Sequence, residues 1–155
     1  MKTIYIFFGE MGCGKTYCAS RFAERHNFKF FEGDSVVTPV MQERVSKFRP
    51  IPRHILDEYL DVLADAIADE AEKVDHLVVS QALYIDEDRE SIRIFLEALG
   101  YRVRMWWVKS RMWRNAQNLL TRKDGWKWVC YWLLNKPFFQ RPKYDHQIFY
   151  NIYSG

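Results

Sequence analysis

Residues 9–16 read Gly9-Glu10-Met11-Gly12-Cys13-Gly14-Lys15-Thr16, and this octapeptide decides the fold. It fits the pattern G-x-x-x-x-G-K-[S/T] at every fixed position. An apolar stretch, Thr3–Phe8, precedes it and has the composition of a buried strand, while Lys15–His26 carries the apolar spacing of a helix. This pattern binds phosphate when it lies between a strand and a helix. The sequence therefore predicts a P-loop.

The residue types in this loop suit a nucleoside triphosphate and its metal ion. Glycines let consecutive backbone N–H groups surround the phosphates, and the following helix adds the positive end of its dipole. Lys15 is expected to reach the β- and γ-phosphates as a point charge, and Thr16 to offer its hydroxyl to Mg²⁺. We therefore predict ATP and Mg²⁺ as cofactors. The predicted loop contacts are Gly9, Gly12, Cys13, Gly14, Lys15 and Thr16.

Strand and helix signals alternate along the chain, which indicates a parallel sheet with helices on both faces. Strands are expected at Thr3–Phe8, 28–31, His76–Ser80, 101–108 and 146–153. Helices are expected at Lys15–His26, from Pro52 onward, from Asp86 to Gly100, and at 110–120. A chain of 155 residues has the length of one domain. We predict a single α/β domain over residues 1–155, a three-layer sandwich of the P-loop NTPase type with about five parallel strands.

The composition argues against several classes of protein. Apolar residues make up 48% of the chain, which is enough for a core. No stretch approaches the roughly 20 apolar residues of a membrane span. Three cysteines without a CxxC pair argue against a disulfide framework or a structural zinc site. The first apolar run lacks a signal-peptide cleavage site, so a cytoplasmic location is expected.

Charge is distributed unevenly along the chain. Residues 54–100 contain 13 acidic and 3 basic residues, whereas residues 101–143 contain 11 basic residues and one acidic residue, Asp124. All six tryptophans lie in the basic part. One interpretation is a solvated acidic face beside an aromatic core that includes Trp113 and Trp132. The other is a surface that faces a polyanion.

Several segments together resemble the small P-loop kinases of the gluconate kinase and shikimate kinase group. Besides the glycine loop, they are Phe30-Phe31-Glu32-Gly33-Asp34, Val78-Val79-Ser80-Gln81-Ala82-Leu83 with Asp88-Arg89, and Arg141-Pro142-Lys143-Tyr144-Asp145. These segments are spread along most of the chain, and only the glycine loop is specific by itself. The resemblance implies a P-loop kinase that transfers the γ-phosphoryl group of ATP to a hydroxyl of a small polar acceptor.

The resemblance also implies roles for residues outside the loop. Asp34 would hold the acceptor hydroxyl, accept its proton and contact Mg²⁺, and its position after a strand beside the P-loop strand agrees with this role. Arg122 would close over the phosphates as part of a lid at residues 121–143. Pro142 and Tyr144 lie in the segment that would pack against the adenine.

Three further residues are predicted to bind the acceptor. Arg49 and Arg53 flank a Pro-Ile-Pro segment and suit an anionic group, with bidentate contact if that group is a carboxylate or a phosphate. Gln81 follows the third strand. The sequence departs from the two kinase families here: a glycine run and a Walker B aspartate are missing, and Ser80 is left to bind a metal-bound water. Tyr84 stands where gluconate kinases carry a lysine.

Three functions fit these patterns. The leading one is a kinase for a small-molecule acceptor, a sugar acid or a similar polyol. A second takes a nucleotide or a nucleic-acid 5′ end as the acceptor, because Gly125-Trp126-Lys127-Trp128 interleaves aromatic and basic side chains. The third is non-catalytic, with ATP switching a surface that docks a partner or a membrane interface.

Overall fold

The central strand of the sheet, β1 (Thr3–Phe8), leads directly into the glycine loop. A computed structural model describes residues 1–142 and 148–150 of the chain. β1 is apolar on both faces, as a strand covered by helices on each side must be. It pairs in parallel with β3 (His76–Ser80) on one side and with β4 (Arg102–Lys109) on the other.

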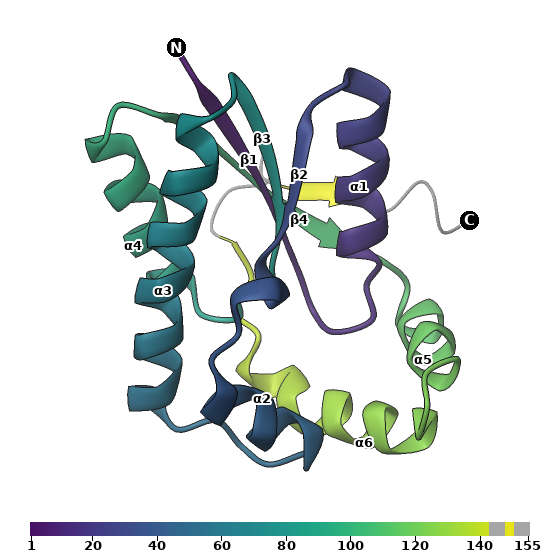
Figure 1. The fold of residues 1–155 in the computed structure, drawn as a ribbon. Helices are drawn as coiled ribbons and strands as arrows, with labels where there is room; N and C mark the ends of the chain where they lie inside the picture. The colour runs from purple at the N-terminus through teal and green to yellow at the C-terminus, as the bar shows by residue number, and fades with distance from the viewer. Residues whose placement is uncertain (143–147, 151–155) are drawn as a thin grey trace.

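Two edge strands complete the sheet, β2 (Lys29–Glu32) beside β3 and β5 (Ile148–Tyr150) beside β4. The strand order is β2-β3-β1-β4-β5, and every pairing is parallel (Figure 1). The predicted sheet of five parallel strands is confirmed. Because parallel strands all end at one edge of the sheet, the loops that follow them meet there, and ligands of such folds collect at that edge.

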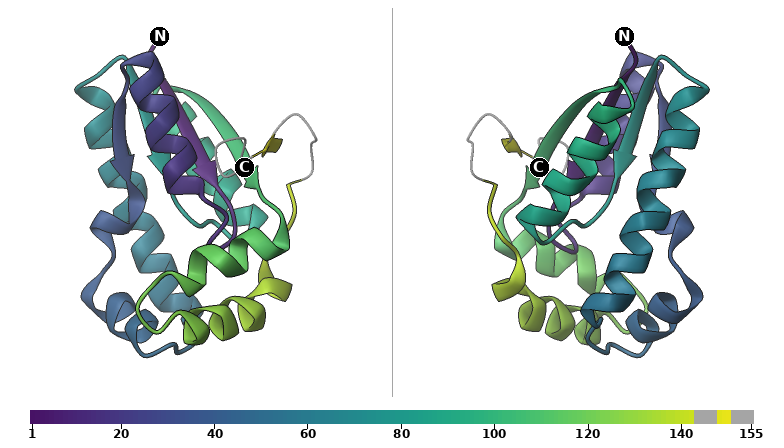
Figure 2. Two further views of the ribbon diagram at one scale, coloured as in Figure 1. Left: turned by 90° about the vertical axis from the view of Figure 1, so that its right-hand side faces the viewer. Right: turned by 90° about the vertical axis from the view of Figure 1, so that its left-hand side faces the viewer.

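Helices cover both faces of the sheet (Figures 1 and 2). On one face lie α3 (Arg53–Glu72) and α4 (Asp86–Ala98), and on the other lies α1 (Lys15–His26). The first face buries a large apolar core whose members include Ile4, Ile6, Tyr59, Leu63, Ile67 and Leu96. The second core is smaller and includes Phe7, Cys18, Ala19, Ala23 and Val108. The predicted three-layer α/β sandwich is therefore confirmed.

One helix, α2, is not predicted by the sequence, and a second, α6, lies in the tract 121–143, which the sequence predicts only as partly loop and partly helix. α2 (Pro39–Ser46) begins with a proline, and the Thr38 hydroxyl caps it by accepting from the Met41 N–H at 3.3 Å. α6 (Gly125–Asn135) and the 3-10 turn η2 (Lys136–Phe138) follow α5 (Met112–Leu120) in the tract that sequence patterns leave unresolved. α2 and α6 lie beyond the carboxyl edge of the sheet (Figure 2).

The aromatic residues of the basic part divide between core and surface. Trp132 on α6 is 2% exposed, as predicted for a core residue. Trp113 on α5 is 47% exposed, so its assignment to the core is wrong. α5 packs on the P-loop through Asn115 and Leu119, and this leaves Trp113 on the opposite side of the helix. Within the described residues, 1–142 and 148–150, no helix has the length and apolar character needed to cross a membrane.

Candidate functional site

The P-loop spans residues 9–16 between β1 and α1, and two of its glycines adopt left-handed backbone conformations. Gly12 has a φ of 78° and Gly14 a φ of 83°, which side-chain-bearing residues rarely adopt. Gly12 also lies against α5, because a Cβ atom there would come within 2.8 Å of Leu119 Cγ and 2.9 Å of the Asn115 carbonyl oxygen. The loop is therefore both curled and closely packed.

α5 supports the P-loop from outside. The Asn115 side chain donates to the Met11 carbonyl at 3.3 Å, and that of Asn118 donates to the Gly12 carbonyl at 2.9 Å. Ser110, which precedes α5, is hydrogen-bonded to the Asn115 side-chain oxygen. These contacts direct the Met11 and Gly12 carbonyls of the loop toward α5. The sequence does not predict these contacts, because an asparagine within a helix does not by itself indicate a hydrogen-bond partner.

A tyrosine contacts the loop from the other side. The Met11 N–H donates to the Tyr84 hydroxyl at 3.1 Å. Burial raises the pKa of Tyr84 to about 12, so the hydroxyl stays protonated at neutral pH. Tyr84 thus supports the loop as a neutral hydrogen-bond acceptor.

Two hydroxyl groups lie where a P-loop metal ion would bind. Thr16 Oγ1, in the first turn of α1, lies 3.2 Å from Ser80 Oγ at the end of β3. The described residues contain no cluster of three or more His, Cys, Asp or Glu side chains that could hold a metal ion by themselves. Mg²⁺ takes few protein ligands and completes its shell with phosphate oxygens and waters, so this hydroxyl pair fits it.

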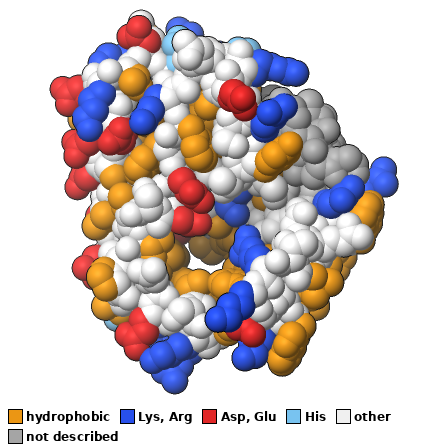
Figure 3. Space-filling view, turned by 45° about the vertical axis from the view of Figure 1, so that its right-hand side comes forward, with side chains coloured by type: hydrophobic (Ala, Val, Ile, Leu, Met, Phe, Trp, Pro, Cys, Tyr) orange, Lys and Arg blue, Asp and Glu red, His pale blue; other side chains and the backbone are white. Residues whose placement is uncertain are grey.

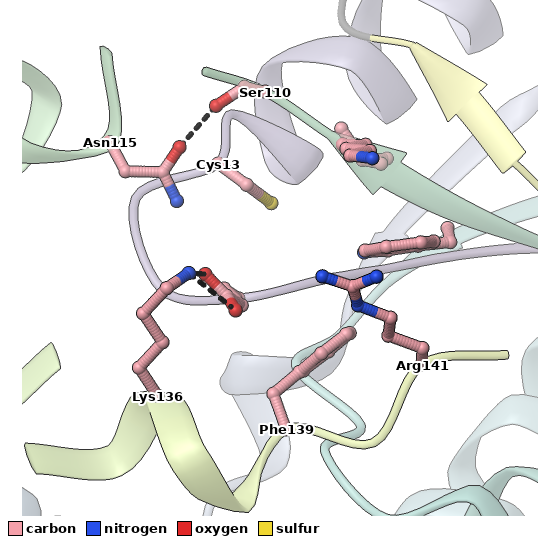
Figure 4. Close-up of a pocket in the computed structure, with 10 residues that line it drawn as sticks. Cys13, Ser110, Asn115, Lys136, Phe139 and Arg141 are labelled. Carbon is pink, nitrogen blue, oxygen red and sulfur yellow. Dashed lines mark hydrogen bonds and ion pairs between the residues drawn. The ribbon is translucent and has the colours of Figure 1, made fainter. Parts of the chain in front are cut away.

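A pocket of about 190 Å³ opens beside the P-loop (Figure 4). Its lining includes Cys13, Ser110, Asn115, Lys136, Phe139 and Arg141. Burial raises the pKa of the Cys13 thiol, so Cys13 contributes a small neutral wall. Pro142 follows Arg141 in the chain and lies next to this pocket lining. Tyr144 lies outside the described residues, and its predicted contact with the adenine stays a prediction.

Glu10, the second residue of the P-loop, joins this pocket to α6. Its carboxylate accepts from Lys136 Nζ at 3.0 and 3.1 Å and from the Trp132 indole N–H at 3.2 Å. Lys136 Nζ lies 5.4 Å from the centre of the Trp132 ring. Neither Glu10 nor Lys136 was among the predicted site residues. Glu10 occupies a variable position of the loop pattern, and only the placement of α6 shows its partner.

Asp34 lies at the carboxyl edge of the sheet, as its position after β2 predicts. It belongs to the 3-10 turn η1 (Gly33–Val36), and the strand residue before this turn, Glu32, is in register with Ser80. The Asp34 side chain is exposed. The neighbouring Gly33 carbonyl accepts from the Tyr59 hydroxyl at 2.8 Å, and burial, together with the Asp34 charge, raises the pKa of Tyr59.

Gln81 packs under this turn. Its side chain is 4% exposed, and a Cβ atom on Gly33 would come within 2.7 Å of Gln81 Oε1. The Gln81 Oε1 atom is buried and has no hydrogen-bond partner among the described residues. The structure thus brings Asp34, Gln81, Ser80 and Thr16 to the same edge of the sheet, while Gln81 lies beneath the surface.

The two arginines predicted to bind the acceptor have different surroundings. Arg53 at the start of α3 forms a bidentate ion pair with Asp88, with contacts of 3.0 and 2.5 Å, and also contacts Asp57 at 2.6 Å. The hydrogen bonds that Arg53 donates to the Asp88 and Asp57 carboxylates raise its pKa further. Arg49 is exposed, and its carbonyl accepts from the Tyr131 hydroxyl of α6 at 3.2 Å. Arg53 is thus already paired with carboxylates, whereas Arg49 borders α6.

Arg122, the predicted lid arginine, lies in the turn between α5 and α6. Its guanidinium lies 5.3 Å from the centre of the Trp128 ring. Trp128 in turn contacts Phe48 from the turn after α2, with ring centroids 4.8 Å apart. One face of the molecule is hollowed, and basic side chains lie along one side of the hollow (Figure 3).

Arg89 is a buried cation that the sequence analysis did not single out as a site residue. It donates to the carbonyls of Leu83 at 2.8 Å and Tyr84 at 3.0 Å, and also to that of Gln140. Burial lowers the pKa of Arg89 to about 10, although the Asp86 and Asp88 carboxylates act in the opposite direction. Arg89 therefore ties the segment after η2 to the loop that carries Tyr84.

Comparison with known proteins gives matches in structure only. No protein-family model matches the sequence, and no curated protein is significantly similar to it. A gluconokinase from Sinorhizobium meliloti 1021 matches with a TM-score of 0.75 at 16% identity, over 96% of this chain and 81% of that one. A sugar kinase from Janibacter sp. HTCC2649 matches with a TM-score of 0.71 at 14% identity, over 97% and 84%.

A third match is the APS kinase of Mycobacterium tuberculosis in complex with AMPPNP and APS. Its TM-score is 0.65 at 16% identity, over 97% of this chain and 88% of that one. Identities this low establish the shape of a chain and leave its activity open. The chain has the fold of the small P-loop kinases.

Proposed function

We propose that the protein is a Mg²⁺-dependent phosphotransferase that moves the γ-phosphoryl group of ATP to a hydroxyl of a small polar acceptor. The observation that carries this proposal is the conformation of residues 9–16, with left-handed Gly12 and Gly14 between β1 and α1. The hydroxyl pair of Thr16 and Ser80 at the same edge supports it. The gluconokinase and sugar kinase with the same fold make a sugar acid or polyol the preferred acceptor class.

On the nucleotide side, the chain supplies charge and orientation. The loop N–H groups and the N-terminus of α1 would bind the β- and γ-phosphates, and Lys15 would neutralise charge as it moves between them. Thr16 and Ser80 would hold Mg²⁺ or its water shell through their hydroxyls. Bound Mg²⁺ would neutralise charge on the phosphate oxygens and align them for transfer. Pro142 and Tyr144 would pack near the adenine.

On the acceptor side, Asp34 would orient the attacking hydroxyl and take its proton, and it would contact Mg²⁺ through water. Gln81 would hold the Asp34 turn in place from below. Arg49 is open to an anionic group of the acceptor, whereas Arg53 would have to leave Asp88 and Asp57 to contact one. Residues 121–143, with Arg122, would form the lid that excludes water from the transferring group.

The decisive experiment is ADP release from Mg·ATP with panels of sugar acids, polyols, nucleosides, nucleotides and 5′-hydroxyl oligonucleotides. We expect one sugar-acid or polyol acceptor to raise turnover well above the acceptor-free rate, and Lys15→Ala to remove the increase. The proposal is wrong if the folded protein binds Mg·ATP and none of the panels raises turnover.

A nucleotide or 5′-hydroxyl polynucleotide is the second candidate acceptor. It is favoured by the exposed face of α5 and α6, where Trp113 is 47% and Trp126 64% exposed and Lys127 lies 5.8 Å from the Trp126 ring centre. Bases stack on aromatic rings and phosphates pair with cations. If this candidate is right, ADP release in the same assays rises when an oligonucleotide or a nucleotide is added. A non-catalytic ATP-dependent docking protein would bind ATP without turnover in any panel.

A further inference from the structure

The Glu10 carboxylate lies in an unexpected place for a phosphate-binding loop. The other features of the loop favour an anion: the left-handed Gly12 and Gly14, Lys15 and the N-terminus of α1. Glu10 adds a negative charge at the rim of the same pocket, and its side chain is only 15% exposed. Its charge opposes the approach of a triphosphate unless a cation compensates for it.

Lys136 supplies that compensating charge. It is the first residue of η2, directly after α6, and it contacts both oxygens of the Glu10 carboxylate. Two further cations, Lys109 and Arg141, line the same pocket. Lys136 contacts the Glu10 carboxylate and so joins the loop to η2, directly after α6.

Building on the proposed function, we infer that Glu10 and Lys136 form a latch that the phosphates of the nucleotide open. In the nucleotide-free protein, Glu10 holds Lys136 and so keeps α6 docked over the P-loop. A bound triphosphate carries more negative charge than one carboxylate and attracts Lys136 away from Glu10. Lys136 then binds phosphate, and Glu10 keeps its bond from the Trp132 indole.

The exchange has two consequences that differ from those of a merely structural ion pair. Glu10 competes with the nucleotide for Lys136, so removing its charge strengthens nucleotide binding. Lys136 holds α6 in both states, first through Glu10 and then through phosphate. A structural pair would instead leave α6 loosened in both states when either partner is replaced.

The test compares Glu10→Gln, Lys136→Gln and the control Lys73→Gln, which replaces an exposed lysine paired with Glu70 at the C-terminal end of α3, outside the site. Amide hydrogen exchange over α6 and η2 is measured without ligand and with saturating Mg·ATP, and affinity for Mg·ATP is measured by calorimetry. Without nucleotide, we expect both latch variants to exchange about fivefold faster than wild type. With Mg·ATP, Glu10→Gln returns to wild-type protection and Lys136→Gln does not.

The two substitutions are expected to change the affinity for Mg·ATP in opposite directions. Glu10→Gln binds Mg·ATP about fivefold more tightly than wild type, Lys136→Gln about tenfold more weakly, and Lys73→Gln equally well. The latch is wrong if wild type binds Mg·ATP while Glu10→Gln binds more weakly or stays unprotected in the bound state. If wild type binds no Mg·ATP, the proposed function is wrong, and Lys136 cannot move from Glu10 to the phosphates of a nucleotide.

Discussion

The hydroxyls of Thr16 and Ser80 lie 3.2 Å apart, and this contact joins the first turn of α1 to the end of β3. The two residues are 64 positions apart in the sequence. Ser80 is 2% exposed, and it follows three buried residues of β3. In the function proposed above, this buried serine at the end of a core strand would be a neutral ligand for metal-bound water, in place of a Walker B aspartate.

We expect Ser80→Ala to lower kcat/KM about tenfold and to raise the Mg²⁺ concentration needed for half-maximal rate, because the outer shell of the ion loses one partner. Ser35→Ala is the matched control, since Ser35 is exposed and its hydroxyl donates to the Glu32 carbonyl at 2.7 Å. Rates are measured over a Mg²⁺ series at fixed ATP. An unchanged Mg²⁺ dependence in Ser80→Ala would remove Ser80 from the metal site.

Lys15→Ala should lower phosphoryl transfer by about 100-fold or more with the fold intact, because the lost charge acts on the transferring phosphates. The side chain belongs to neither apolar core. Turnover is measured beside circular dichroism, with Lys29→Ala on β2 as the control. Near-normal turnover in a folded Lys15→Ala would exclude Lys15 from the mechanism.

Asp34→Asn should lower kcat by about 100-fold or more and leave the affinity for ATP almost unchanged. The amide keeps the shape of the side chain but cannot accept the proton of the acceptor. Glu32→Gln is the control, because Glu32 is an exposed carboxylate two residues earlier at the end of β2. A loss of ATP affinity with kcat preserved would place Asp34 on the nucleotide side.

Arg89→Met should destabilise the protein by about 3 kcal/mol, because it leaves the buried Leu83 carbonyl without this donor and breaks the bonds to the Tyr84 and Gln140 carbonyls. Arg93→Met on the same helix is the control. Arg93 pairs with Glu90 and Glu97 at the surface, so its loss should cost less than about 1 kcal/mol. Urea unfolding compares the two, and equal stability would show that Arg89 is not a structural tie.

The sequence predicts the layered fold because the fold follows from local patterns. Apolar runs predict the strands, and apolar residues spaced at helical intervals predict α1 and α3. The glycine loop predicts that a strand, β1, precedes it and that a helix, α1, follows it. α2 and α6 are harder to predict. α2 is short and only weakly amphipathic, and α6 presents apolar side chains to solvent as well as to the core, with Leu134 73% exposed. Neither helix offers the one-sided pattern that prediction depends on.

The candidate site likewise contains residues that the sequence predicts and residues that it does not. Loop residues such as Gly12, Gly14 and Lys15 are predictable because the motif is contiguous and its spacing is fixed. The contacts of Glu10 and Arg89 are not, because their partners lie far along the chain: Lys136 is 126 positions from Glu10, and Gln140 is 51 positions from Arg89. Such pairs follow only from the packing of α6 and η2 against the edge of the sheet.

The last prediction concerns residues 121–143 as a lid. The tract carries six basic residues and one acidic residue, so its charge favours docking onto a triphosphate. It is already anchored on two sides, by Phe48 against Trp128 and by Glu10 against Trp132. Closure upon nucleotide binding would therefore tighten these existing contacts. Gly125 would be the hinge, and it packs closely, since a Cβ atom there would come within 2.4 Å of the Leu120 carbonyl oxygen.

Titration with Mg·ATP should shift tryptophan emission, since Trp126 is 64% exposed and has room to lose solvent, and should slow amide exchange over residues 121–142 about threefold or more. Trp113→Phe, on α5 outside the tract, should keep the emission shift. A 5′-hydroxyl oligonucleotide is titrated in parallel, because a nucleic-acid acceptor would protect the tract even without ATP. If neither ligand changes exchange between residues 121 and 142, the tract is a fixed part of the core, and the three-layer sandwich carries no lid there.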